Sequence, residues 1–184
     1  AAAGALASLA GHRRQAAWSV SAVPIQRDLL LEAPISETAP PLAAPSEGED
    51  LVADYSALNL TLGRHPLTLL RPHLDAKRYL TAATLRTLEH NRPARCAGIV
   101  TCRQRPGTAS GVIFLTLEDE TGLANIIVHA HLAERQRREL LTARLLGVLG
   151  VLQREGEIVH LLAKRLIDHS ELLGRLPTSS RDFC

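Results

Sequence analysis

The spacing of apolar side chains changes near residue 93 and divides the chain into two kinds of pattern. In several segments before that point, apolar residues recur every three to four positions, as they do on one face of a helix. Beyond it, short runs alternate apolar and polar side chains, as half-buried strands do. The pattern predicts short helices in the first half of the chain and a β-rich second half.

Five strands and one helix are predicted over residues 93–168. The helix is strongly charged and falls at about 133–142, after the third strand. The runs that we predict as strands are 95–103, 112–119, 123–129, 143–153 and 157–166. Three strands, a helix and two strands is the order of an OB fold, a small five-stranded Greek-key barrel. We therefore predict a mainly β fold with its helix between strands 3 and 4.

Side-chain alternation also indicates which face of strands 2 and 3 points into the barrel. A barrel interior accepts aliphatic side chains and excludes asparagine, so Asn125 is expected outside. The side chains predicted to point inward are Ile113, Leu115, Leu117, Ala124, Ile126 and Val128. Phe114, Ile127 and His129 then share the outer face with Asn125.

The remaining segments are interpreted from composition and from helix start signals. Residues 1–23 have helical character, and residues 24–50 are rich in Pro, Ala and Glu, which is typical of a disordered linker. Residues 51–92 are predicted as a helical connector in which Thr81 caps a helix. Residues 169–184 are predicted as a C-terminal tail behind the barrel domain.

Charge is distributed unevenly along the chain. Residues 1–60 carry 3 basic and 7 acidic side chains, whereas residues 61–184 carry 18 basic and 12 acidic ones. A basic module joined to an acidic segment favours a polyanionic partner for the second part alone. Of the 18 basic residues 16 are Arg, whose planar guanidinium suits phosphates and stacked bases. A codon bias toward Arg would produce the same composition.

Membrane and secreted classes do not fit the sequence. No apolar run approaches the roughly 18 residues that a membrane helix needs, and the Ala-rich start lacks the basic segment of a signal peptide. Cys96, Cys102 and Cys184 form no paired framework, which suits the reducing cytoplasm. We therefore expect a cytoplasmic protein without a membrane partner. A chain that has no Met and begins Ala-Ala-Ala-Gly is also expected to be a piece of a longer protein.

Two long segments are similar to a known family. The stretch RQRPGTASGVIFLTLEDETGLANIIV, from Arg103 to Val128, resembles the C-terminal barrel of the bacterial error-prone DNA polymerases, and so does QREGEIVHLLAKRL, from Gln153 to Leu166. These enzymes are damage-induced relatives of the DNA polymerase III alpha subunit. The upstream RHPLTLLRPHL and the terminal SRDF also look like that family.

The N-terminal helix resembles the end of the helix-hairpin-helix region that precedes the barrel in this family. The likeness rests on Arg13, Arg14 and Trp18. The segment from Leu9 to His12 departs from the leucine-glycine-leucine pattern expected before the arginines. The exact packing of this helix therefore does not follow from the resemblance.

The resemblance implies that the parent protein is a DNA-directed DNA polymerase, a nucleotidyltransferase that acts in translesion synthesis, DNA repair and DNA replication after DNA damage. Its catalytic carboxylates and magnesium ions belong to a palm domain upstream of this chain. This piece is therefore expected to hold no cofactor and to be inactive alone. Its expected partners are single-stranded DNA, the rest of the polymerase chain and accessory proteins of the translesion machinery.

OB folds hold oligonucleotides on the outer face of strands 2 and 3, between loops 1–2 and 4–5. On this basis the candidate nucleic-acid-binding residues are Arg103, Arg105, Phe114, Asn125, His129 and Arg154. The arginines, placed in the two loops, would meet phosphates, and the phenyl ring would stack on a base. The asparagine and histidine would hydrogen-bond to sugars or bases. In the alternative interpretation the arginines are solvated rim residues, and the phenyl ring packs under the linker.

No segment carries a catalytic or metal-binding pattern. Glu118, Asp119 and Glu120 follow a strand into a tight turn, where successive carboxylates point in different directions, so we predict a solvated turn. His129 and His131 can face the same way, but no third ligand lies nearby in the sequence. No nucleophile–base pair and no phosphate loop is recognisable, so we predict neither a catalytic site nor a metal site.

Three functions fit this pattern. The first is an appendage that holds single-stranded template DNA. The second is an RNA-binding module, similar to the anticodon-binding barrels of some aminoacyl-tRNA synthetases. The third is a barrel that docks onto a protein and binds no nucleic acid. Salt-sensitive binding of oligo-dT favours the first function, equal affinity for a stem-loop RNA favours the second, and no binding to either favours the third.

Overall fold

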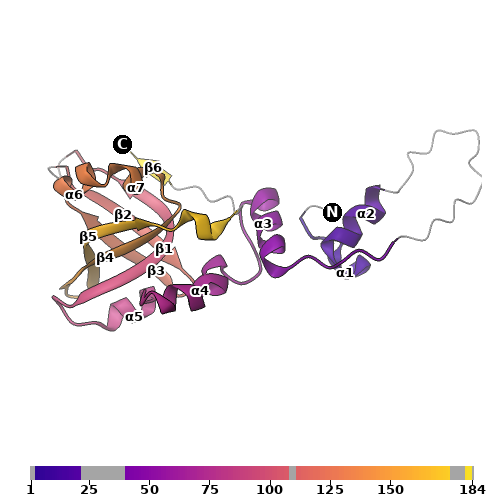
Figure 1. Ribbon diagram of the computed structural model, residues 1–184, viewed down its shortest axis with the longest axis horizontal. Helices are drawn as coiled ribbons and strands as arrows, with labels where there is room; N and C mark the ends of the chain where they lie inside the picture. Colours follow the sequence, from indigo (N-terminus) through magenta and orange to yellow (C-terminus); the bar gives the residue numbers. More distant parts are fainter. Residues whose placement is uncertain (1–2, 22–39, 108–110, 175–180, 184) are drawn as a thin grey trace, which may run out of the picture. The chain divides into compact units, whose positions relative to one another are not determined.

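The computed structural model describes residues 3–21, 40–107, 111–174 and 181–183. The chain divides into two units, Ala1–Leu62 and Gly63–Cys184, and each is described by itself (Figure 1). Most of the predicted linker, residues 24–39, lies outside the described residues. Within the described ranges, no helix is both long and apolar enough to cross a membrane.

The described part of the first unit contains the helices α1 (Ala7–Ala10), α2 (Arg13–Ser21) and α3 (Glu47–Leu58). A capping box starts α3. The Ser46 hydroxyl accepts a hydrogen bond from the Glu49 amide, and the Glu49 carboxylate accepts one from the Ser46 amide. The helix thus begins inside the segment that the sequence predicts as linker.

Polar contacts join α2 to α3. The Arg13 guanidinium donates to the carbonyl oxygen of Asp50 at 3.0 Å and to the carboxylate of Asp54. Apolar burial is limited, since Ala16 and Leu51 are the buried hydrophobic residues in the described part of this unit. The first unit is therefore held by ion pairs and capping more than by a core.

Two helices precede the barrel in the second unit, α4 (Pro66–Ala76) and α5 (Ala82–Thr87). His65 caps α4, and its ring accepts a hydrogen bond from the second residue of the helix at 3.1 Å. Thr81 caps α5 by accepting a hydrogen bond from the Thr84 amide at 3.2 Å, which confirms the predicted cap.

Five strands then close into a barrel whose neighbours follow the order β1–β2–β3–β5–β4 and back to β1. The strands are β1 (Pro93–Gln104), β2 (Ile113–Asp119), β3 (Gly122–Val128), β4 (Leu145–Glu155) and β5 (Ile158–Asp168). β3 and β5 run parallel, and the other neighbours in the barrel run antiparallel. The predicted five-stranded OB barrel is confirmed.

Two short helices, α6 (Ala130–Arg135) and α7 (Arg137–Thr142), stand where the sequence predicts one. Figure 1 shows them at one end of the barrel and α5 at the other. After β5 come the 3₁₀ helix η1 (Ser170–Leu173) and β6 (Arg181–Phe183), which pairs in parallel with β1. Part of the predicted tail therefore extends the sheet.

The barrel interior is aliphatic, as the alternation predicts. Leu115, Leu117, Ile126 and Val128 are at most 2% exposed and belong to one core cluster. Ile113 and Ala124 also face this core, but they lie near strand ends and are only partly buried. The predicted direction of the side chains in strands 2 and 3 is confirmed.

Two irregularities interrupt the strand register and decide which side chains lie outside. One falls between Val100 and Cys102 in β1, opposite β2. The other falls between Leu149 and Gly150 in β4, opposite β5. At the second, a side chain on Gly150 would overlap the carbonyl oxygen of Leu162, so only glycine fits the close approach of the two backbones.

Candidate nucleic-acid interface

The outer surface of β2, β3 and β5 carries two rows of side chains that the strand register aligns. One row runs from Thr116 through Asn125 to His160. The other lies two residues away on each strand and runs from Phe114 to Leu162. We call this group the sheet patch, and it consists of Phe114, Thr116, Asn125, Ile127, His160 and Leu162.

The sheet patch combines flat rings with a free amide. Phe114 and His160 are half-buried, and Asn125 is exposed. Within the described residues, the Asn125 side chain takes part in no hydrogen bond, and Nδ1 of His160 is buried without a partner. A nucleobase has a flat face and polar edges, and this patch offers a partner to each.

A cation and two rings lie near the end of β3. Arg105 is exposed, and its Nη2 lies 3.7 Å from the position that a Cβ would take on Gly111. The Cβ of Ala130, the first residue of α6, is 3.2 Å from the same position. Ala130 lies between His129 and His131, whose rings stack with centroids 6.2 Å apart. We call Arg105, His129 and His131 the Arg105 cluster.

Arg103 does not lie in the loop where the sequence placed it. It is in β1, is 9% exposed, and pairs with the inward-facing Leu115. Its guanidinium donates to the carbonyl oxygens of Leu140, at 2.8 Å, and of Ala143, at the end of α7. The register shift after Val100 adds one residue to β1 and turns Arg103 inward. The loop placement is therefore wrong, and the side chain holds α7 to the barrel.

Arg154 is also bound to the protein's own backbone. It lies within β4, and its Nη2 donates to the carbonyl oxygen of Leu88 at 3.0 Å and to that of Arg86. These carbonyls end α5. The prediction that Arg154 lies in loop 4–5 is therefore wrong, because β4 extends to Glu155 and the side chain turns back to α5.

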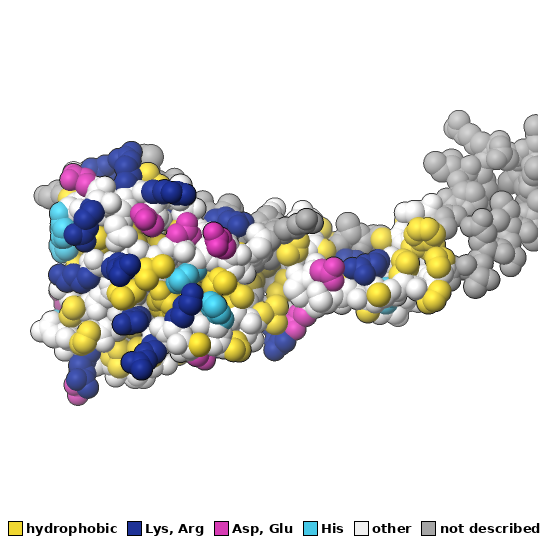
Figure 2. Space-filling model, in the orientation of Figure 1, with side chains coloured by type: hydrophobic (Ala, Val, Ile, Leu, Met, Phe, Trp, Pro, Cys, Tyr) yellow, Lys and Arg dark blue, Asp and Glu magenta, His cyan; other side chains and the backbone are white. Residues whose placement is uncertain are grey.

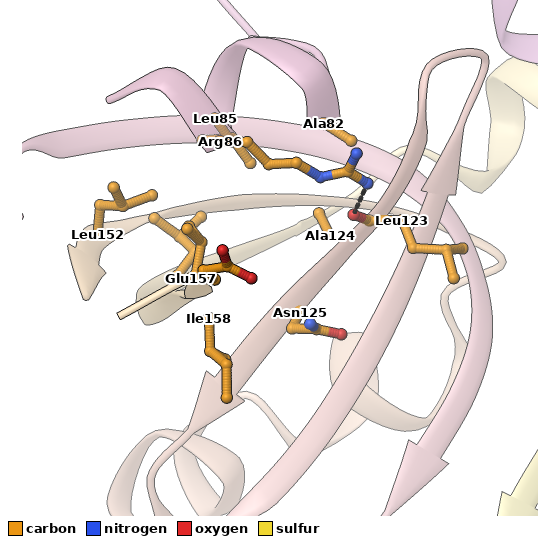
Figure 3. A pocket seen from close by; sticks show the side chains of 11 residues that line it. Ala82, Leu85, Arg86, Leu123, Ala124, Asn125, Leu152, Glu157 and Ile158 are labelled. Atoms are coloured by element: carbon orange, nitrogen blue, oxygen red, sulfur yellow. Dashed lines mark hydrogen bonds between the residues drawn. The ribbon is translucent and has the colours of Figure 1, made fainter. Parts of the chain in front are cut away.

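A pocket of about 240 Å³ opens beside the sheet patch, between α5 and the first residues of β3 and β5. Figure 3 shows Leu85, Ala124 and Leu152 among its apolar lining residues, with Asn125 and Glu157 at its polar side. Arg86 crosses one edge and donates to the carbonyl oxygen of Leu123 at 3.1 Å. Pockets for drug-sized ligands measure roughly 300–1,000 Å³, so this smaller one suits a single ring system.

The carboxylates of Asp119, at the end of β2, and of Glu120, in the turn that follows, are structural. Asp119 is 5% exposed and accepts hydrogen bonds from the amides of Ala82 and Thr121, both at 2.7 Å. Glu120 is paired with Arg71 on α4, with Oε2 and Nη2 2.8 Å apart. The predicted solvated turn is therefore wrong at Asp119, which holds α5 against the barrel.

These carboxylates do not fit a magnesium site. Their oxygens are turned to amides and a guanidinium, which are hydrogen-bond donors. Across the described part of the chain, no group of three or more His, Cys, Asp or Glu side chains is arranged to hold a metal ion.

The sequence analysis did not single out His160 and Leu162, which belong to the sheet patch. Their outward direction can be inferred from the chain, because they alternate with Leu161 and Ala163, which are at most 2% exposed. Their place beside Asn125 depends on the parallel pairing of β3 with β5, and no local sequence pattern indicates that pairing.

No family model matches the chain. It is 64% identical over 183 residues to the error-prone DNA polymerase of Azoarcus sp. strain BH72 and 60% identical over 181 residues to that of Aromatoleum aromaticum. These alignments cover 100% and 98% of this chain. The chain is related to the C-terminal region of error-prone DNA polymerases.

The chain spans about 17% of the length of these error-prone DNA polymerases. Among solved structures, it is similar to asparaginyl-tRNA synthetase from Pyrococcus horikoshii in complex with asparaginyl-adenylate. That alignment has a TM-score of 0.40 and 17% identity, and it covers 50% of this chain and 22% of the synthetase.

Proposed function

We propose that this chain is the part of an error-prone DNA polymerase that holds single-stranded template DNA. The observation that carries the proposal is the sheet patch, which joins two rings and an exposed amide on the outer face of the barrel. The Arg105 cluster adds a cation and two more rings at the end of β3. Flat groups for bases beside a cation for phosphates are what unpaired DNA requires.

In the proposed mode of binding, bases stack on Phe114 and His160, and the Asn125 amide hydrogen-bonds to a base edge. One unstacked base enters the pocket beside Asn125, and Arg105 meets a phosphate. Stacking contributes about 1–3 kcal/mol per base by substitution. With few rings and one cation in reach, the affinity of this face alone is expected to be modest.

The parent polymerase would carry out DNA-directed synthesis past damaged template bases. Its catalytic carboxylates and magnesium ions would lie in other parts of the longer protein. The barrel would raise the local concentration of template near that site by tethering the strand. Accessory proteins of translesion synthesis would act on the same complex.

Fluorescence anisotropy of a labelled oligo-dT tests the proposal on the full chain, at low and at moderate salt. We expect binding that weakens steeply as salt rises, because phosphate contacts release counterions. A stem-loop RNA of equal length serves as the comparison ligand. Equal affinity for the RNA would favour an RNA-binding module, and no binding to either at low salt would favour a protein-docking barrel.

A further inference from the structure

Exposed cations gather on a second outer face of the barrel, formed by β1, β4 and β5. Leu149 in β4 pairs with Arg95 on one side and with Arg165 on the other, so the two arginines flank it. Both are exposed, as are Lys77 and Arg78 at the end of α4. Many Lys and Arg side chains are visible on the barrel in Figure 2, among apolar, histidine and acidic side chains.

The second register shift adds a further cation to this face. Because Leu149 pairs with Arg165 and Gly150 pairs with Ala163, Lys164 is an extra residue in β5. Two successive side chains, Lys164 and Arg165, are therefore exposed where a regular strand would turn one inward. We call Lys77, Arg78, Arg95, Lys164 and Arg165 the basic face.

An open hollow of about 490 Å³ lies on the basic face, and no carboxylate lines it. Lys77, Arg78 and Arg95 contribute to its wall. Tyr79 and His169 form its ring-lined side, with the Tyr79 hydroxyl 2.9 Å from Nε2 of His169. The hollow thus combines positive charge with aromatic groups.

The cations of the basic face have no acidic partner among the described residues. The nearby acids are engaged elsewhere. Asp75 is 3.7 Å from Nη1 of Arg71, and Asp168 accepts a hydrogen bond from the Ser170 amide at 2.8 Å. Within the part of the chain that the structure describes, no ion pair neutralises the cations of this face.

We propose that the basic face binds the phosphodiester backbone of the single-stranded DNA that crosses the sheet patch. The inference rests on the proposed function for its ligand and extends it to a second surface. β5 connects the two surfaces, since Leu162 belongs to the sheet patch and Lys164 follows two residues later. A strand that leaves the patch along β5 meets Lys164 and Arg165, then Arg95 and the hollow.

The test uses the double variant Arg95→Gln/Arg165→Gln, which removes two charges and keeps two polar side chains of moderate size. Its matched control is Arg137→Gln/Arg138→Gln, an equal change of charge at two exposed positions of α7. Each is titrated with oligo-dT of about 6 and about 20 nucleotides, which lie near the lower end of the site sizes of OB folds and above their upper end. Thermal unfolding confirms that both variants are folded.

We expect the basic-face variant to bind the longer oligonucleotide about 10-fold more weakly. The slope of log K against log salt concentration should be smaller in magnitude by about 1.4, because two phosphate contacts are lost. Binding of the short oligonucleotide, and both titrations of the control, should stay unchanged. Unchanged binding of the longer strand, or an equal loss in the control, would overturn the inference.

The two proposals fail separately. If the basic-face variant binds as the parent chain does but Phe114→Leu weakens both oligonucleotides, the proposed function stands and the second surface is refuted. If the short oligonucleotide does not bind and the basic-face variant loses the longer one, the sheet patch is refuted, and the basic face binds the strand without it.

Discussion

The sheet patch and the basic face differ in nearly everything that a DNA strand would contact. The patch contains rings, an amide and aliphatic groups, and none of its six side chains is Lys, Arg, Asp or Glu. The basic face contains five cations, three of which line a hollow that no carboxylate lines. β5 passes from one composition to the other between Leu162 and Lys164. A barrel of five strands can therefore keep groups suited to bases apart from groups suited to phosphates.

The largest expected effect is a loss of stability of the barrel that carries both faces. Gly150→Ala would force a methyl group into the carbonyl oxygen of Leu162. This position lies at the register shift that determines which side chains of β5 point outward. We expect a loss of more than about 3 kcal/mol in the free energy of unfolding, since backbone atoms cannot yield as side chains do. Thermal unfolding measures it. Gly107→Ala, where nothing lies within 4 Å of the added group, is the control and should unfold as the parent does.

Substitutions at Arg103 and Arg105, two positions apart in the chain, should affect stability and DNA binding separately. Arg103→Gln removes a buried guanidinium that holds two carbonyls of α7, and it should lower the free energy of unfolding by about 1.5–3 kcal/mol. Arg105→Gln should leave stability within about 0.5 kcal/mol, because the side chain is exposed, and should weaken DNA binding. Urea denaturation and anisotropy at low temperature give both quantities. The reverse assignment of the two effects would contradict the geometry of β1.

A stacking test acts on the sheet patch alone. Phe114→Leu keeps an apolar side chain but removes the ring, so affinity for short and long oligo-dT should fall by about 5- to 150-fold, or about 1–3 kcal/mol. Phe114→Trp restores a flat surface and should retain binding. Equal affinities of the leucine and tryptophan variants would show that no base stacks at this position.

The smallest expected effect concerns pH. Burial lowers the pKa of His169 below its usual 6.5, and the charges of Lys77 and His73 lower it further. The unfolded chain therefore binds this proton more readily, so stability present near pH 7 should fall as the pH drops through 6.5. His169→Gln should flatten this dependence, measured as the urea midpoint between pH 7.5 and 5. His65, whose pKa burial also lowers, contributes in the same direction, so part of the dependence should remain. A pH dependence in His169→Gln equal to that of the parent chain would contradict the role of His169.

The barrel was predictable because its signal is local. Leu115 and Leu117 alternate with Thr116 and Glu118, and the order of strands and helix follows directly from the chain. Arg103 was misplaced because the register shift after Val100 comes from pairing with β2, which a single strand does not display. Asp119 was misjudged for a similar reason. Its partners Ala82 and Arg71 lie 37 and 48 residues earlier in the chain, so its burial is a tertiary effect.

One pair of neighbouring strands in the barrel, β3 and β5, is joined over only a short length. β3 and β5 pair through Asn125, Ile127 and the residue between them, whereas β4 and β5 pair along nearly their whole lengths. This seam should be the first to exchange its amide hydrogens, because few backbone bonds hold it. The sheet patch lies across the same seam. A polynucleotide bound there would contact both strands of this pair. Its binding would therefore stabilise the closed barrel against local and global unfolding.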